Sequence, residues 1–455
     1  MPMNASKEEE HHQEYLEILA DAIDRNDHNG VSTLLDELHP AEVASLLESL
    51  PQRDRDIVWA QLTDDQHGDV LAEAEDAVRA SRMVQMDPGQ LAAVASDVDV
   101  DDAVDILQDL PSERVEEVLQ AMDHQDRLRL ESVLVYPEDT AGGLMNTDVI
   151  TIRADVSLET VMRYLRRRGE IPEKTNRLMV VDRDNRFVGG LRLAALLIND
   201  PSTTVQEIME TNLPAIPAPM TEHEVAMLFE QRDLISAPVI DEEGHLLGRI
   251  TIDDVVDVIR DEGDRSLMSM AGLHEEEDMF APVFTAARAR ALWLGVNLAT
   301  ALFASWVIGW FEATLQQVVA LAILMPVVAS MGGIAGSQAL TVVIRGMALG
   351  HVAWSNARVL IIKELLVAVL NSVVWALVVG AVAVIWFGDG RLGLIVGAAL
   401  IINLVVAALS GAGIPLLLKK LSIDPAIAGG VILTTVTDVV GFIAFLGLGT
   451  AFLLA

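Results

Sequence analysis

The sequence has no cysteine among its 455 residues. Disulfide bonds and thiolate metal sites are therefore excluded, although this absence identifies no compartment, because cytosolic domains need no disulfides. Histidine is also absent from the five long apolar stretches of the second half. A site built for Zn²⁺ or copper within those stretches is disfavoured for the same reason. A cation bound there would be held by oxygen ligands.

Basic residues are scarce in the first 285 residues, which hold 23 Lys and Arg against 62 Asp and Glu, a balance of −39. From Ala286 to Ala455 the counts are eight and five, a balance of +3. The chain is thus an acidic soluble half joined to an apolar half. The acidic half has no basic patch or aromatic-interleaved basic run, so nucleic acid is not an expected partner. The opening residues, MPMNASKEEEHHQEYLE, lack an apolar stretch, so we expect no secretory signal and a cytosolic N-terminus.

Five stretches of the second half are apolar enough to cross a lipid bilayer, which takes roughly 20 helical residues. We place them at about 291–311, 318–344, 359–387, 392–418 and 426–454. A buried soluble helix bundle is the alternative, but five successive runs exceed what a globular core needs. Seven of the eight basic residues of this half fall on one side, and only Arg391 falls on the other. The positive-inside rule then predicts a multi-pass protein of the cell (inner) membrane with a cytosolic N-terminus and an outside C-terminus.

The second stretch, MPVVASMGGIAGSQALTVVIRG, carries Pro326 and a cluster of glycines at Gly332, Gly333 and Gly336. Such residues are tolerated inside a bilayer where the freed backbone groups face protein or a wet cavity. We therefore expect a broken helix that lines a cavity. Close packing of helices through small residues is the alternative.

Asp438 lies in the middle of the last apolar stretch, ILTTVTDVVGFIAFLGLG. A carboxylate at mid-membrane costs about 2.5 to 3.5 kcal/mol, so it is normally retained where water or a cation compensates it. Thr434 lies one turn earlier on the same helical face, and Gly441 lies nearby. We interpret Asp438 as an anion that lines a pore, with a protonated, hydrogen-bonded packing residue as the alternative.

The remaining polar residues of the apolar half are less specific. Four acids lie near span ends and are expected at the interface or at helix termini: Glu312, Glu364, Asp389 and Asp424. Three asparagines line the pathway or form hydrogen bonds between helices, and the sequence does not choose between these roles: Asn297, Asn371 and Asn403.

The acidic half contains two internal repeats. The segment EVASLLESLP at 42–51 recurs as DAVDILQDLP at 102–111, and helical periodicity follows each copy. Repeated helix pairs predict a small superhelical domain up to about Val135. Further on, two copies of a strand, helix, strand, turn, strand, helix pattern follow each other, the first lengthened by its GEIPEK loop.

The last helix of the second copy, from Ile252, carries aspartates at four-residue steps: Asp253, Asp257 and Asp261. Like charges so placed repel by a few tenths of a kcal/mol per pair, which a divalent cation between them would relieve. Asp101 and Asp105 form a similar pair. A solvated face is the alternative for each of these residues.

In this order of parts the chain resembles the MgtE magnesium channels over essentially its full length. The most specific matches are TAGGLM before the first strand, MGGIAGSQALTVVIRG in the second span and DPAIAGGVILTTVTDVVGF in the fifth. The resemblance implies a homodimer in which Asp438, with Thr434 beside it, binds hydrated Mg²⁺ in a pore along the two-fold axis. It also implies that cytosolic Mg²⁺ closes the pore by binding the N and CBS domains. The implied sensor residues are Asp101, Asp105, Asp233, Asp254, Asp257 and Glu262.

The chain departs from the family pattern at Ile334, where members usually carry asparagine, and at Gly430 and Val431, where they carry Asn or Gly followed by Pro. Acidic family positions of the sensor also correspond here to non-acidic residues: Pro219, Thr221, Arg265 and Ser266. We therefore expect gating by Mg²⁺ with fewer or altered sites. The CBS nucleotide pattern Gly-x-x-Thr-x-x-Asp is present once, as Gly248, Thr251 and Asp254, and would bind ATP.

The expected fold is a multidomain chain with four parts. These are an α-helical superhelical N domain (1–136), an α/β tandem CBS pair (137–263, with modules at about 140–201 and 204–263), a linking or plug helix (264–287) and an all-α five-helix transmembrane domain (288–455). We expect a Mg²⁺ channel or transporter rather than an enzyme, because no second mid-span aspartate exists for an intramembrane aspartyl protease. A proton-coupled carrier, or a transporter that also takes Co²⁺, Mn²⁺ or Ni²⁺, remains the alternative. A chloride channel would need a pathway charge of the opposite sign.

Overall fold

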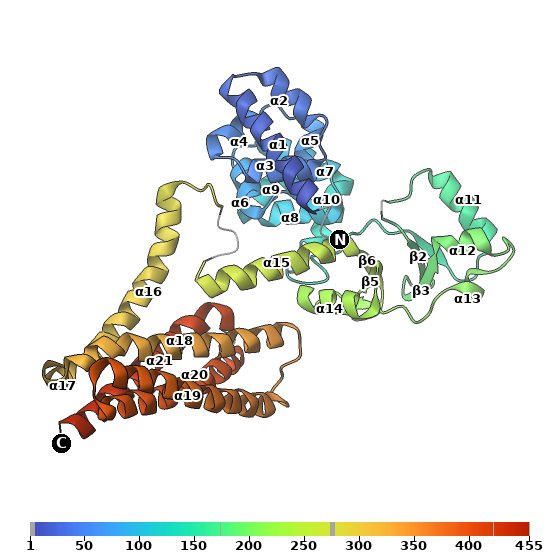
Figure 1. The fold of residues 1–455 in the computed structure, drawn as a ribbon. Coiled ribbons are helices and arrows are strands. Elements are labelled where there is room, and N and C mark those ends of the chain that lie inside the picture. The colour runs from blue at the N-terminus through green and yellow to red at the C-terminus, as the bar shows by residue number, and fades with distance from the viewer. Residues whose placement is uncertain (1–4, 173, 274–277, 422, 455) are drawn as a thin grey trace. The chain divides into compact units, whose positions relative to one another are not determined.

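The computed structural model describes residues 5–172, 174–273, 278–421 and 423–454. The chain divides into two compact units, one of Met1–Asp264 with Glu276–Pro282 and one of Arg265–Glu275 with Val283–Ala455. Figure 1 shows the elements of both. Each unit is described by itself.

The N domain consists of ten helices, which confirms the predicted helical architecture. They are α1 (Ala5–Asp24), α2 (His28–Leu35), α3 (Pro40–Glu48), α4 (Gln52–Trp59), α5 (Asp64–Glu73), α6 (Asp76–Met83), α7 (Pro88–Asp97), α8 (Val100–Gln108), α9 (Ser112–Ala121) and α10 (His124–Val133). Several begin at an aspartate whose carboxylate accepts hydrogen bonds from first-turn N–H groups, as Asp27, Asp87 and Asp123 do.

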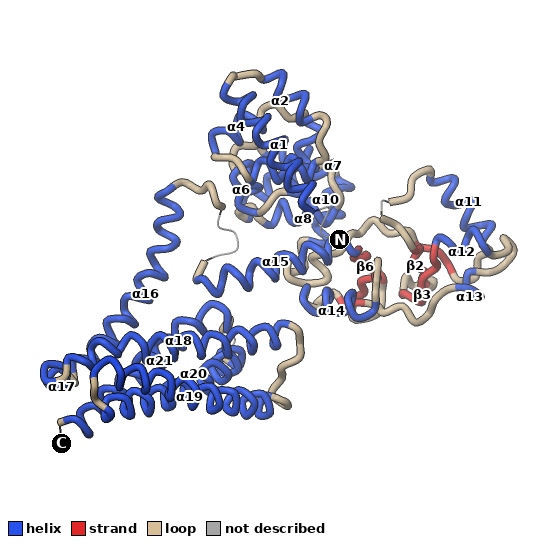
Figure 2. The backbone as a smooth tube through the Cα atoms, in the orientation of Figure 1, coloured by secondary structure: helices blue, strands red, loops and turns tan. Residues whose placement is uncertain are grey.

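Each CBS module contains one three-stranded sheet (Figure 2). The first has β1 (Thr151–Arg153), β2 (Arg177–Val181) and β3 (Phe187–Arg192), with α11 (Leu158–Arg168), α12 (Leu193–Ile198) and α13 (Val205–Ile208). The second has β4 (Ile216–Pro217), β5 (Ser236–Ile240) and β6 (Leu246–Thr251), with α14 (Glu222–Arg232) and α15 (Ile252–Ala271). In each sheet the second strand along the chain lies in the middle. The first strand pairs with it in parallel and the third strand pairs with it in antiparallel orientation. The predicted order of elements is confirmed.

One apolar core joins the N domain to the second CBS module. Val104 and Leu107 of α8 belong to the same buried cluster as Ile250 of β6 and Val255 of α15. Burial of this shared surface holds the start of α8 and the start of α15 within one structure. The first CBS module has a separate apolar core that includes Ile152 and Leu178.

The predicted linking helix over 264–287 includes residues 274–277, which lie outside the described residues, and the segments on either side of them belong to two different helices. Residues up to Ala271 continue α15 without a break from Ile252. The chain then turns at Gly272, which has a φ of 72° that suits glycine, and Leu273 N–H donates to the Met268 carbonyl as at a helix end. The next helix begins only at Val283.

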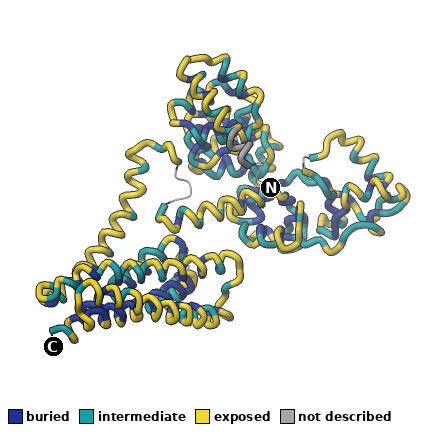
Figure 3. The backbone as a smooth tube through the Cα atoms, viewed as in Figure 1, coloured by how far each residue is buried: buried dark blue, intermediate teal, exposed yellow. Residues whose placement is uncertain are grey.

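Five helices of the second unit are long and apolar enough to span a membrane, which confirms the predicted number. They are α16 (Val283–Gly309), α18 (Val319–Ala348), α19 (Ala357–Phe387), α20 (Gly390–Lys420) and α21 (Pro425–Leu453), with the short α17 (Glu312–Gln317) after the first. The most buried of the five is α20, which packs against α18, α19 and α21. Most of α16 is exposed along its length (Figure 3).

The predicted break in the second span is wrong, because α18 runs unbroken through Pro326 and its glycines. Gly332 and Gly336 instead allow close packing. A Cβ at Gly332 would lie 2.2 Å from Asn403 Nδ2, and one at Gly336 would lie 2.9 Å from Leu433 Cδ1. At these two glycines the structure therefore agrees with the alternative prediction, close packing of helices through small residues. Gly333 has open space beside it and faces the hollow side of the helix.

Candidate functional site

Three carboxylates lie close together at the start of α8. Ligand atoms of Asp99, Asp101 and Asp102 all lie within 4.8 Å of one another. Asp254, in the first turn of α15, is close enough to raise the pKa of both Asp101 and Asp102. We call these four residues the interface cluster, because α8 belongs to the N domain and α15 to the second CBS module.

Two donors fix the geometry of the interface cluster. Asn146 Nδ2 donates to Asp101 Oδ1 at 3.1 Å. Thr251 donates to Asp254 Oδ2 from its backbone N–H at 2.9 Å and from its hydroxyl at 3.1 Å. These bonds point carboxylates of two domains toward a common region while leaving oxygen lone pairs for another ligand.

Burial is the main electrostatic influence on these acids. Together with neighbouring carboxylates it raises the pKa of Asp102 to about 7 and that of Asp254 to about 6. Burial and the charges of Asp254, Asp102 and Asp99 raise the pKa of Asp101 well above its usual range. Crowded carboxylates in a partly dehydrated place must either hold protons or share a cation. The four residues thus fit a hard divalent cation with oxygen ligands.

Lys174 is a member of this region that the sequence analysis missed. Its ammonium forms an ion pair with Asp253, which adjoins Asp254. Burial lowers the pKa of Lys174, but the hydrogen bond and charge of Asp253 outweigh it, so the pKa is raised overall. The available signal was the GEIPEK loop, because the extra residues of the first CBS copy carry this lysine.

The other predicted sensor residues lie in different surroundings. Asp105 lies beside Arg79 and Glu138, and burial raises its pKa to about 8. Asp257 is one turn beyond Asp253 and lies near Arg260 and Glu73; burial raises its pKa.

Glu262 and Asp233 are engaged elsewhere. Glu262 Oε1 lies 2.6 Å from His223 Nδ1, in a hydrogen bond between α15 and α14. Asp233 ends α14 with a φ of 49° and lines a separate cavity in the CBS pair. Of the six predicted sensor residues, the structure therefore brings only Asp101 and Asp254 together.

That separate cavity has a volume of about 620 Å³ and contains three arginines, Arg177, Arg192 and Arg232. Glu210 is ion-paired with Arg177 at 3.0 Å and also with Arg192. An anionic ligand there would compete with this internal carboxylate.

In this structure, Gly248 and Thr251 of the predicted nucleotide pattern contact neighbouring segments of the protein itself. A Cβ at Gly248 would lie 2.6 Å from the Asn146 carbonyl oxygen, so glycine allows the two segments to pair. The Thr251 hydroxyl donates to Asp253 at 2.5 Å and to Asp254 at 3.1 Å. These hydrogen bonds favour a role for Thr251 in stabilising the start of α15.

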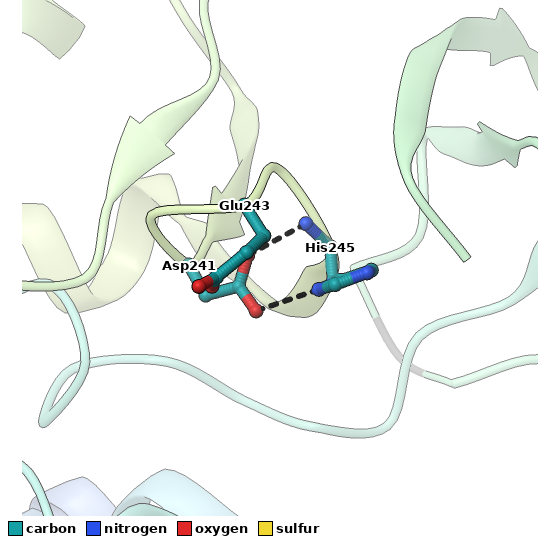
Figure 4. A group of neighbouring side chains, drawn as sticks. All are labelled: Asp241, Glu243 and His245. Carbon is teal, nitrogen blue, oxygen red and sulfur yellow. Dashed lines mark hydrogen bonds and ion pairs between the residues drawn. The ribbon is translucent and has the colours of Figure 1, made fainter. Parts of the chain in front are cut away.

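A second group of possible metal ligands lies in the turn between β5 and β6, where Asp241, Glu243 and His245 gather (Figure 4). His245 donates its backbone N–H to Asp241 Oδ1 at 2.7 Å, and its Nδ1 lies 2.8 Å from Oδ2. Both oxygens of Asp241 are thus engaged within the turn, as is typical of an Asx-type turn.

In the membrane unit, Asp438 lies on α21 and is half-buried. Within residues 278–421 and 423–454, no side chain or backbone group forms a hydrogen bond or ion pair with its carboxylate. Thr434, one turn earlier, is exposed and donates its hydroxyl to the Gly430 carbonyl at 2.9 Å. An unpaired carboxylate on an apolar helix is where a bound cation would be most stabilised.

The neighbouring helix α18 has a hollow face. A cavity of about 640 Å³ is lined by Ser330, Gly333, Ile334, Ser337, Gln338, Thr341 and Val342. Four of these side chains carry hydroxyl or amide groups, although most of the surface that lines the hollow is apolar. Gly336 packs α18 against Leu433 of α21, so the hollow helix and the helix of Asp438 are adjacent.

Comparison with known proteins covers all these parts. The MgtE family, described as a divalent cation transporter, matches residues 325–448, its intracellular N domain matches residues 38–139, and the CBS domain matches residues 141–197 and 205–261. Magnesium transporter MgtE of Bacillus subtilis (strain 168) is 30% identical over 92% of this chain and 93% of its own length. Magnesium transporter MgtE of Thermus thermophilus is 30% identical over 94% of this chain and 96% of its own.

A solved structure is also similar. The crystal structure of the cytosolic domain of the Mg²⁺ channel MgtE in complex with ATP is 31% identical, with a TM-score of 0.49, over 53% of this chain and 99% of that one. Because relatives at 30% identity match nearly the whole length, the chain belongs to the MgtE family of divalent cation transporters.

Proposed function

We propose that this protein transports Mg²⁺ across the cell membrane along a path in which Asp438 binds the hydrated ion. The observation that carries the proposal is the half-buried Asp438 carboxylate, which has no partner in the described part of the membrane unit. Mg²⁺ prefers oxygen ligands and keeps much of its water, so one carboxylate per chain with backbone oxygens suits it. The name magnesium transporter, carried by the relatives, supports the same cation here.

The path is proposed to lie on the two-fold axis of a homodimer in the cell membrane. The hollow face of α18 supports this arrangement, because its hydroxyl and amide groups can find hydrogen-bond partners in water or in a second copy but not in lipid tails. The distribution of basic residues supports a cytosolic N-terminus and an outside C-terminus.

Closure by cytosolic Mg²⁺ is the proposed regulation. The interface cluster supports it, since carboxylates of α8 and α15 repel one another until a cation neutralises them. High internal Mg²⁺ would hold the N domain against the CBS pair and close the path through α15. Participation of Asp105, Asp233, Asp257 and Glu262 remains a prediction.

The test is a Mg²⁺ flux assay in liposomes with the full-length protein. Wild type should pass Mg²⁺, and Asp438→Ala should lose nearly all flux while remaining folded. The proposal would be contradicted if the wild-type protein passed no Mg²⁺ in either insertion orientation, even with a low Mg²⁺ concentration on both sides of the membrane.

Two alternatives give distinct outcomes in the same assay. A proton-coupled carrier would show flux that depends on an imposed proton gradient, whereas a channel would not. A broader divalent transporter would pass Co²⁺, Mn²⁺ or Ni²⁺ as fast as Mg²⁺, since these hydrated ions resemble it.

ATP binding by the CBS pair through Gly248, Thr251 and Asp254 stays a prediction. Equilibrium binding of ATP to the full-length protein tests it. Asp254→Asn should weaken binding if this carboxylate contacts the nucleotide. Unchanged binding in Asp254→Asn, combined with loss in Arg192→Gln, would place the nucleotide in the arginine-lined cavity.

A further inference from the structure

Asn403 is a fully buried amide in α20, the central membrane helix. Its Nδ2 donates to the Val328 carbonyl of α18 at 2.9 Å. Its Oδ1 is buried and has no hydrogen-bond partner within the part of the chain that the structure describes. The carbonyl oxygen of this amide is therefore unsatisfied in an apolar interior, which is a cost to stability.

Two glycines on two other helices make room for this amide. A Cβ at Gly332 of α18 would lie 2.2 Å from Asn403 Nδ2, and a Cβ at Gly441 of α21 would lie 2.8 Å from the same atom. Neither helix could approach α20 so closely with a larger residue. Helices α18, α20 and α21 thus meet at Asn403.

This meeting point lies next to both parts of the proposed path. Gly441 follows Asp438 by three residues, close to one helical turn, so the two lie on neighbouring positions of one face. On α18, Gly332 directly precedes Gly333 and lies two residues after Ser330, both of which line the hollow face. A shift at Asn403 would change the separation between that hollow face and Asp438.

An apolar side chain of similar size would fill the same space without an unsatisfied oxygen. A polar group in a membrane interior is more often retained for a specific contact than for stability, because hydrogen bonds between membrane helices contribute little on average. We propose that Asn403 is a positioning residue for transport, which sets the distance between the hollow face of α18 and the Asp438 carboxylate. This inference rests on the proposed role of Asp438.

The test compares Asn403→Leu with Gln317→Leu, a control at an exposed amide of α17 in the same membrane unit. Asn403→Leu should fold as well as wild type, lower Mg²⁺ flux by about tenfold, the factor of one net hydrogen bond, and reduce discrimination of Mg²⁺ against Ca²⁺. Gln317→Leu should leave both unchanged. Wild-type flux and discrimination in Asn403→Leu would overturn the proposal, as would a flux loss fully matched by loss of folded protein.

A second measurement does not depend on transport. The chain has no cysteine, so Ser330→Cys supplies a single thiol on the hollow face. Its rate of modification by a small charged thiol reagent should change in the Asn403→Leu background and stay constant in the Gln317→Leu background. If wild type passes no Mg²⁺ but this rate changes, the proposed function fails and the positioning role survives. An unchanged rate in both backgrounds would overturn the positioning role by itself.

Discussion

The Arg55 guanidinium binds both carboxylate oxygens of Asp278, at 2.6 and 2.7 Å. Arg55 is 1% exposed, and it also donates to the carbonyls of Leu47 and Glu48. This pair therefore fixes Asp278, which precedes the first membrane span, to α4 of the N domain, and all three guanidinium nitrogens of Arg55 donate hydrogen bonds.

Loss of one partner from that pair should be strongly destabilising. Asp278→Asn leaves a buried guanidinium without a counter-charge, which typically costs about 3 to 5 kcal/mol. Thermal unfolding of the full-length protein in detergent measures it. Asp21→Asn, which breaks an exposed pair with Arg25, is the matched control and should change stability by less than about 1 kcal/mol. Equal effects of the two substitutions would show that the Arg55 pair is as solvated as a surface pair.

The raised pKa values of the acids at the start of α8 and α15 predict an unusual pH dependence. The pKa of Asp102, about 7, and that of Asp105, about 8, lie above the unfolded value of about 3.9, so the folded state binds more protons between these limits. Stability without divalent cations should therefore fall as pH rises from about 4 to about 8. Thermal unfolding in a chelator, measured across this range, checks the sign.

Mg²⁺ should weaken this dependence, because a cation bound to the interface cluster would replace its protons, whereas the contribution of Asp105, which lies outside the cluster, should remain. Asp102→Asn should likewise weaken the pH dependence in chelator without Mg²⁺. A stability that rises with pH in chelator would contradict the electrostatic description of the cluster.

Asp257→Asn should raise the internal Mg²⁺ concentration needed for closure, since it removes one carboxylate near Asp253. Protection of the cytosolic half from protease, titrated with Mg²⁺, measures the shift. Asp184→Asn, in an exposed turn of the first CBS module, is the control and should leave the midpoint unchanged. Identical midpoints for Asp257→Asn and wild type would remove Asp257 from the sensor.

Gly332→Ala should destabilise the membrane unit, because the new methyl group would collide with Asn403. The next residue provides the control, since a Cβ at Gly333 meets no atom within 4 Å. Thermal unfolding in detergent should show that Gly332→Ala lowers the free energy of unfolding by about 1 to 3 kcal/mol, which is typical of overpacking. Gly333→Ala should change it little. Similar stability of both variants would contradict the close approach of α18 and α20.

Much of the architecture could be predicted from the sequence because it depends on local patterns. Helical periodicity and internal repeats indicated the N domain and the CBS pair, and long apolar runs indicated the five spans. The helix break at Gly272 could not be anticipated, since glycine also occurs within helices of this chain. Likewise, the sequence is compatible with either a helix break or close packing at Gly332 and Gly336, because their packing partners, Asn403 and Leu433, lie on other helices.

The site was predictable in residue type more than in grouping. Asp101 and Asp254 meet because α8 and α15 share a core, and no local pattern reports such a contact. Charge spacing along one helix could not show that Glu262 is hydrogen-bonded to His223 instead. Lys174 escaped notice because it lies in a loop, where periodicity carries no information.

The most direct test of the central claim is Mg²⁺ flux through Asp438→Asn, which keeps the shape of the side chain and removes its charge. If the anion binds the passing ion, flux should fall nearly to the level of protein-free liposomes while the folded protein keeps its thermal stability. Flux equal to that of wild type would contradict the account, because it would leave Asp438 a packing role only.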